Sequence, residues 1–100
     1  MTAYIIVNYQ VEDADQYKNY QKGAGPALGI GSDCKVRVLE HNSEVLEGDP
    51  GGNTVVLEFE SREKAKEIWS SQAYRDVVDL RLGASSKHFA VLVDQFEMPS

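Results

Sequence analysis

The stretch AYIIVNYQVEDAD, Ala3–Asp15, is rich in β-branched and aromatic residues and then turns acidic, which predicts a strand over 3–11 followed by a helix start. Alternate residues of a strand point to opposite faces. One face of this strand carries Ile5 and Val7, and the other carries Tyr4 and Ile6. Both faces are apolar, so both sides of the sheet that contains this strand must be covered.

From Ala14 the apolar residues take helical spacing as far as Leu28, and glycines 29 and 31 then end the run. This spacing predicts a helix directly after the first strand. A proline inside a helix removes a backbone donor. We therefore expect a break or an irregular turn near Pro26.

The remaining chain alternates strand and turn signals before a second helical region. CKVRVLE and EVLEG predict one strand interrupted at HNS, or a strand with a short return, and DPGGN is a turn signal before the strand TVVLEFE. Ser61 is placed to cap a helix and Ser71 to restart it. FAVLVDQF is expected to be the final strand.

The expected order is β-α-β-β-α-β, which gives an α+β, ferredoxin-like fold: a four-stranded antiparallel sheet with its helices on one face. We expect a single domain over residues 1–100. The last strand is also apolar on both faces, so the face without helices needs a cover. A second copy packed sheet to sheet would supply it and make a dimeric α+β barrel.

Composition excludes several classes of partner. The chain has a formal net charge of −6, from 10 basic and 16 acidic residues, and its basic residues are scattered. This argues against nucleic acid and against an anionic membrane surface. Cys34 is the only cysteine, which excludes an intrachain disulfide, and the first residues resemble neither a signal peptide nor a membrane span. We expect a cytoplasmic protein.

Arg81 lies in the stretch YRDVVDLRLGAS, residues 74–85, near the centre of an arc of apolar residues. A guanidinium stays protonated in a protein, so it needs an acidic or multiply accepting partner. Three alternatives are open: an anchor for a ligand carboxylate or enolate, an internal ion pair, or a side chain that reaches solvent. The candidate acids for the ion pair are Glu47, Asp49 and Glu58.

Other candidate site residues are weaker. Tyr74 and Ser85 share the arc of Arg81, Asn8 interrupts an apolar strand face, and Arg37 alternates with valines. His41 and Tyr74 are candidate proton carriers. The spacing of Tyr17, Tyr20 and Trp69 indicates core or pocket wall. We expect no metal and no cofactor, because no ligand set has metal spacing and the glycines lack a phosphate-binding pattern.

Several motifs together resemble one family. SSQAYRDVVDLR, KVR, EVLEGD and VVLEFESREKAKEIW are similar to segments of the family called domain of unknown function 1330 (DUF1330), within the dimeric α+β barrel superfamily, and the resemblance runs from about Ala3 to Phe96. It implies the fold and a homodimer, and in it Arg37 matches an arginine of the second strand. The wider superfamily includes small monooxygenases, muconolactone-isomerase-like enzymes, haem proteins and ligand-binding modules, so the fold does not fix the function.

Two functional hypotheses follow. In the first, the protein binds a small carboxylate or enolisable molecule between helices and sheet, with Arg81 as anchor, and is a cofactor-independent isomerase or monooxygenase-like enzyme if it turns that molecule over. In the second, it is a non-enzymatic dimerisation or ligand-sensing module, in which Arg81 and an acid such as Glu47 form a structural clasp. The proposed ligand site comprises Arg81, Tyr74, Ser85, Arg37, Glu47 and Asn8.

Overall fold

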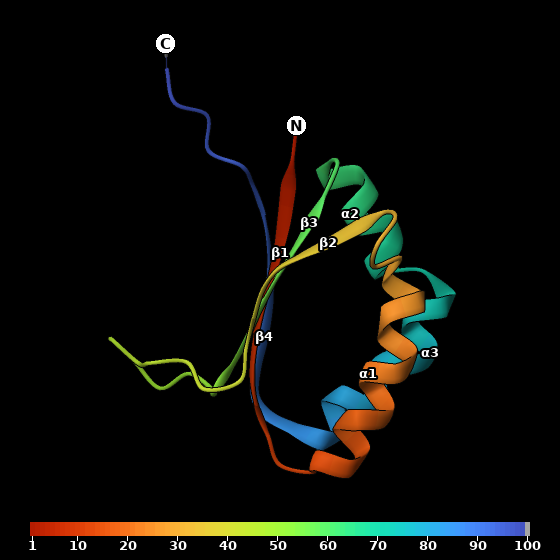
Figure 1. Ribbon diagram of the computed structural model, residues 1–100, viewed down its shortest axis with the longest axis vertical. Coiled ribbons are helices and arrows are strands. Elements are labelled where there is room, and N and C mark those ends of the chain that lie inside the picture. Colours follow the sequence, from red (N-terminus) through yellow and green to blue (C-terminus); the bar gives the residue numbers. More distant parts are fainter. Residues whose placement is uncertain (100) are drawn as a thin grey trace.

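One antiparallel sheet of four strands carries all three helices on a single face, as Figure 1 shows for the computed structural model. The structure describes residues 1–99. The elements are β1 (Ala3–Val11), α1 (Ala14–Leu28), β2 (Cys34–Glu40), β3 (Asn53–Phe59), α2 (Arg62–Trp69), α3 (Gln72–Ala84) and β4 (Ser85–Asp94). The strand order is β2-β3-β1-β4, which confirms the ferredoxin-like α+β fold.

The helix boundaries follow from side-chain caps. The side chains of Asp13, Ser61 and Ser71 accept hydrogen bonds from backbone N–H groups in the first turns of α1, α2 and α3. The predictions that Ser61 caps a helix and that Ser71 starts the next are confirmed. Gly29 ends α1 in the left-handed conformation, with φ of 71°.

The expected break near Pro26 is wrong. Helix α1 continues through Pro26 to Leu28. Proline leaves the carbonyl of residue i−4 without its helical donor, and that residue is Lys22, on the exposed side of the helix. Because water can hydrate this carbonyl, the helix has no need to end there.

The expected strand or return in EVLEG is also wrong. Residues 41–52 form an irregular segment between β2 and β3. Ser43 and Gly52 hold its base together, with the Ser43 N–H donating to the Gly52 carbonyl over 2.9 Å. Beyond that base the side chains face no other strand, so the apolar Leu46 is 87% exposed.

The face of the sheet without helices carries a row of β-branched residues. Val38 pairs with Val56, Val56 with Ile6, and Ile6 with Val91, so the row crosses all four strands. These residues are half-buried or exposed, whereas the opposite face of β1 is buried beneath the helices. The prediction that β1 is apolar on both faces is confirmed.

Gly51 lies against the backbone of β1. Asn8, which is buried, holds it there: the Asn8 amide donates to the Gly51 carbonyl over 3.1 Å, and the Gly51 N–H donates back to the Asn8 side-chain oxygen over 2.8 Å. A Cβ atom at position 51 would lie 2.1 Å from the carbonyl carbon of Tyr9. Only glycine fits at this position.

We expect Gly51→Ala to lower the free energy of unfolding by about 2 to 3 kcal/mol, because backbone must move to make room for the methyl group. Gly52→Ala is the matched control. A Cβ atom there would come no closer than 3.4 Å to another group, so its effect should stay within about 0.5 kcal/mol. Urea unfolding measures both, and equal midpoints would contradict this account of Gly51.

Candidate functional site

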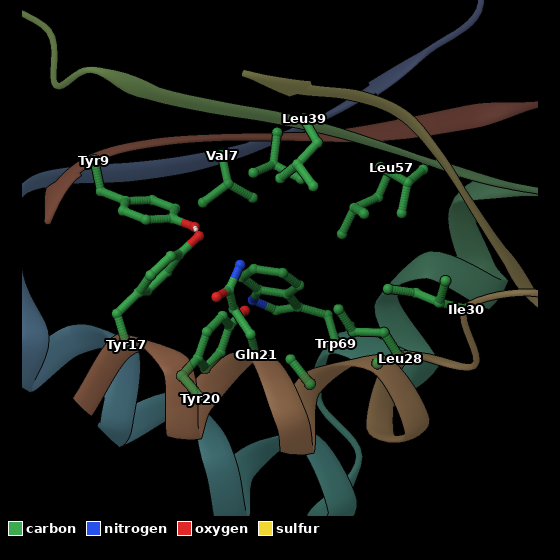
Figure 2. Close-up of a pocket in the computed structure, with 14 residues that line it drawn as sticks. Val7, Tyr9, Tyr17, Tyr20, Gln21, Leu28, Ile30, Leu39, Leu57 and Trp69 are labelled. Atoms are coloured by element: carbon green, nitrogen blue, oxygen red, sulfur yellow. Dashed lines mark hydrogen bonds between the residues drawn. The ribbon is translucent and has the colours of Figure 1, made fainter. Parts of the chain in front are cut away.

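A cavity of about 210 Å³ lies between α1 and the helix-covered side of β1, β2 and β3 (Figure 2). We call it the main cavity. Its lining is mostly apolar and aromatic, and no charged side chain belongs to it: Val7, Tyr9, Tyr17, Tyr20, Gln21, Ala24, Gly25, Leu28, Ile30, Val36, Leu39, Val55, Leu57 and Trp69. The main cavity is therefore suited to an apolar guest.

The main cavity opens beside β2. Three of its apolar lining residues are substantially exposed, namely Ile30 at 44%, Val36 at 39% and Leu39 at 53%. They come from β2 and from the turn that precedes it. The other wall is closed by buried residues of β1 and α1. A small molecule would therefore enter between β2 and α1.

Tyrosine hydroxyls form the polar end of the main cavity. The hydroxyl oxygens of Tyr9 and Tyr17 are 2.5 Å apart, and Figure 2 shows them meeting at one end of the cavity, whose lining also includes Gln21. Burial, and after it the hydrogen bond to Tyr17, raises the pKa of Tyr9 far above its ordinary value. One hydroxyl hydrogen lies between the two oxygens, so the other is free to donate to a ligand.

Arg81 lies behind three aromatic lining residues of this cavity, Tyr9, Tyr20 and Trp69, which we call the aromatic wall. Its side chain leaves α3 and is 3% exposed. The guanidinium carbon is 5.3 Å from the ring centroid of Tyr9, 5.7 Å from that of Tyr20 and 5.9 Å from that of Trp69. The prediction that Arg81 points into the apolar interior is confirmed. Its stabilisation there comes from three rings.

The ion pair considered for Arg81 is absent within residues 1–99. Glu58 pairs instead with Arg37, and Asp49 with Lys87, while Glu47 lies in the exposed 41–52 segment. The Nε atom of Arg81 is buried and has no hydrogen-bond partner. Although burial opposes the charge, the neighbouring Tyr74 and Tyr20 raise the pKa of Arg81. The guanidinium is therefore a buried cation without a compensating carboxylate.

Tyr74 adjoins Arg81 and does not line the main cavity. Its hydroxyl is 2.8 Å from that of Tyr20, and its ring centroid is 4.7 Å from that of Trp69. Burial, followed by the charge and hydrogen-bond effects of Tyr74, raises the pKa of Tyr20 far above its ordinary value. Tyr20 is thus a neutral hydrogen-bonding group. Ser85 donates to the backbone carbonyl of Arg81 over 2.6 Å, at the end of α3.

The remaining candidates lie apart from the main cavity. Asn8 holds Gly51, and Arg37 donates twice to Glu58, over 3.0 and 3.2 Å. The Nδ1 atom of His41 is 2.8 Å from the Asn53 side-chain oxygen. None of these three candidates belongs to the lining of the main cavity.

Two further features of residues 1–99 concern metals and membranes. No three His, Cys, Asp or Glu side chains in this range are grouped so that they could hold a metal ion. No helix in the same range combines the length and the apolar character needed to cross a membrane.

Burial raises the pKa of the Cys34 thiol to about 11, so the thiol is protonated and a poor nucleophile at neutral pH.

Sequence reasoning missed two residues of the polar end. Tyr17, Tyr20 and Trp69 were expected in the core or the pocket wall, and they do line the main cavity. Tyr9 and Gln21 were not singled out. The available signal was Tyr9 on the buried face of β1, where a polar tip on an otherwise apolar face demands a partner. Gln21 gave no signal, because a glutamine at the border of a helix face is common.

One family model matches nearly the whole chain. The model "Domain of unknown function (DUF1330)" matches residues 2–96. No curated protein matches the sequence.

Solved structures with the same fold span nearly the whole chain. A protein of unknown function from Rhodopseudomonas palustris is 17% identical, with a TM-score of 0.76 over 97% of this chain and 84% of that protein. A dimeric ferredoxin-like protein of unknown function from Thermobifida fusca is 12% identical, with a TM-score of 0.65 over 95% and 92%. A proposed antibiotic biosynthesis monooxygenase from Caulobacter crescentus is also 12% identical, with a TM-score of 0.65 over 96% and 91%. At these identities the likeness establishes the fold.

Proposed function

The chain belongs to the DUF1330 family, and we propose that it binds a small, largely apolar molecule with a hydrogen-bond acceptor, such as a ketone, in the main cavity. The observation that carries this proposal is an apolar cavity of about 210 Å³ with a hydrogen-bonded pair of tyrosine hydroxyls at one end. An apolar cavity of about 150 Å³ is enough to hold benzene. The main cavity therefore suits one ring with a short substituent.

The lining favours a neutral ligand over a carboxylate. No lining residue is charged, and burying an unpaired carboxylate among apolar side chains is costly. A carbonyl oxygen, by contrast, needs one or two donors, which the Tyr9 and Tyr17 hydroxyls and the Gln21 amide supply. Of the two ligand classes expected from the sequence, the enolisable carbonyl compound fits the main cavity better.

Binding is favoured over catalysis in this cavity. Isomerisation of a ketone, or oxygenation through its enolate, begins with removal of a proton by a base. The lining holds no histidine, carboxylate or lysine, and its tyrosines Tyr9 and Tyr20 have pKa values raised far above neutrality. The monooxygenase activity proposed for the Caulobacter protein therefore has no counterpart among the groups that face this cavity.

Replacing both hydroxyls tests the polar end. The double variant Tyr9→Phe with Tyr17→Phe removes both partners of one hydrogen bond, which leaves no stranded polar group and should keep the fold. We expect its affinity for acetophenone to fall about tenfold, a loss of about 1.4 kcal/mol, as measured by titration calorimetry. Its affinity for ethylbenzene, which lacks the acceptor, should not fall.

Tyr4→Phe is the matched control for this experiment. Tyr4 lies on the sheet face without helices, where its hydroxyl donates a hydrogen bond to the Gln95 side-chain oxygen. The same chemical change there should leave the affinities for acetophenone and ethylbenzene unaltered. An equal loss for both ligands would contradict the role given to the hydroxyl pair. Failure of the unaltered protein to bind either ligand would contradict the proposed function itself.

We further propose that a second copy of the chain covers the open face of the sheet. The β-branched row that crosses all four strands is half-buried or exposed on that face. Figure 1 shows the 41–52 segment and the residues after β4 extending to the same side, away from the helices. They carry exposed apolar side chains, among them Leu46 at 87% and Phe96 at 76%. A copy related by two-fold symmetry would bury these groups together.

We expect light scattering to give about twice the 11.1 kDa of one chain, and Val91→Lys to give a monomer. A lysine at position 91 places a charge at the β4 end of the apolar row, where a symmetric interface would bury it. Leu82→Lys, a comparable change at a partly exposed position of α3, should leave the dimer intact. A monomeric unaltered protein at micromolar concentration would contradict the proposed dimer.

A further inference from the structure

A second hollow, with a volume of about 270 Å³, lies between α3 and β4 and has a different character from the main cavity. We call it the α3–β4 hollow. Trp69 is the only described residue that lines both spaces. Arg81, Arg75 and His88 supply the polar part of its lining, and no carboxylate belongs to it.

We propose that the α3–β4 hollow is a binding site for a small organic carboxylate, with Arg81 as its principal ligand-binding residue. Arg81 lines the hollow, and its Nε atom is buried without a partner. The rings, together with the hydroxyls of Tyr20 and Tyr74, satisfy the guanidinium incompletely, because its Nε–H donor still requires an acceptor. A carboxylate would supply acceptors and neutralise the buried charge in one step.

Arg75 also lines the α3–β4 hollow and would add a second cation near the carboxylate. Its Nη2 atom donates to the Trp69 carbonyl over 2.7 Å, and its guanidinium carbon lies 5.4 Å from the ring centroid of Tyr74. Within residues 1–99 no acid forms an ion pair with Arg75. The guanidinium is thus held beside the hollow by a carbonyl and a ring while its charge remains uncompensated.

The other lining residues select an organic anion over an inorganic one. Five of them are apolar or aromatic: Trp69, Val78, Leu82, Phe89 and Ala90. A bare phosphate would gain nothing from these walls and would lose hydration beside them. An aromatic or short aliphatic carboxylate would place its acid group on Arg81 and its hydrocarbon part against Trp69 and Val78.

This site is independent of the ligand proposed for the main cavity. The two ligand classes differ, since the main cavity lacks charged groups and the α3–β4 hollow has three basic side chains. The sequence suggested that Arg81 binds a carboxylate. In this proposal the carboxylate binds in the α3–β4 hollow and not in the main cavity.

The test compares benzoate with its neutral counterpart benzamide by titration calorimetry. We expect benzoate to bind the unaltered protein, with benzamide at least tenfold weaker. Arg81→Gln should abolish benzoate binding, and Arg75→Gln, a change at an exposed position, should weaken it severalfold without affecting the fold. Arg62→Gln is the matched control, because Arg62 pairs with Asp94 at the opposite end of β4, and it should bind benzoate as the unaltered protein does.

Nuclear magnetic resonance of the arginine Nε–H groups gives a second readout that needs no variant. Benzoate should shift the Arg81 signal strongly, whereas acetophenone should not. The Tyr9→Phe, Tyr17→Phe double variant should keep its affinity for benzoate, so failure of the main-cavity proposal would leave this one standing. No shift of the Arg81 signal by benzoate, equal affinity for benzoate and benzamide, or stronger binding of inorganic phosphate would each overturn the proposal.

Discussion

A guanidinium buried without a carboxylate is the constraint on which the helix side of the molecule depends. The three rings around Arg81 come from three different elements: Tyr9 from β1, Tyr20 from α1 and Trp69 from α2. Arg81 itself comes from α3. A cation is attracted to the face of an aromatic ring, so one charge helps to set the positions of four elements. The hydroxyl pair of Tyr20 and Tyr74 then ties α1 to α3.

This aromatic wall separates two spaces of opposite chemistry. On one side the main cavity is apolar and ends in the paired hydroxyls of Tyr9 and Tyr17. On the other side the α3–β4 hollow contains the basic side chains of Arg81, Arg75 and His88. Trp69 contributes to both linings. The position proposed for each ligand class therefore follows from which side of the wall offers it a complementary group.

Periodicity made much of this arrangement predictable from the sequence. The strand and helix spacing gave the ferredoxin-like order, and serines 61 and 71 marked two helix starts because their hydroxyls replace missing backbone partners. The same spacing placed Arg81 on the buried face of its helix. These features depend on residues close together in the chain.

What could not be predicted depends on residues far apart in the chain. Glu58 was a candidate partner for Arg81 but lies beside Arg37, because the β2–β3 pairing decides its neighbours. The cavity end needs Tyr9 of β1 to meet Tyr17 of α1, and sequence spacing does not report that contact. The apolar residues of EVLEG suggested a strand, yet no neighbouring strand pairs with them.

If Arg81 is buried to bind a ligand and not to neutralise an internal acid, the free energy of unfolding of Arg81→Met shows it most directly. Methionine keeps much of the side-chain length and removes the charge. If no carboxylate is left unpaired, urea unfolding should give a stability within about 1 kcal/mol of the unaltered protein, because the cost of burying the cation and its attraction to the three rings are lost together. A loss of about 3 to 5 kcal/mol would mean that Arg81 neutralises a buried acid and would contradict its ligand-binding role.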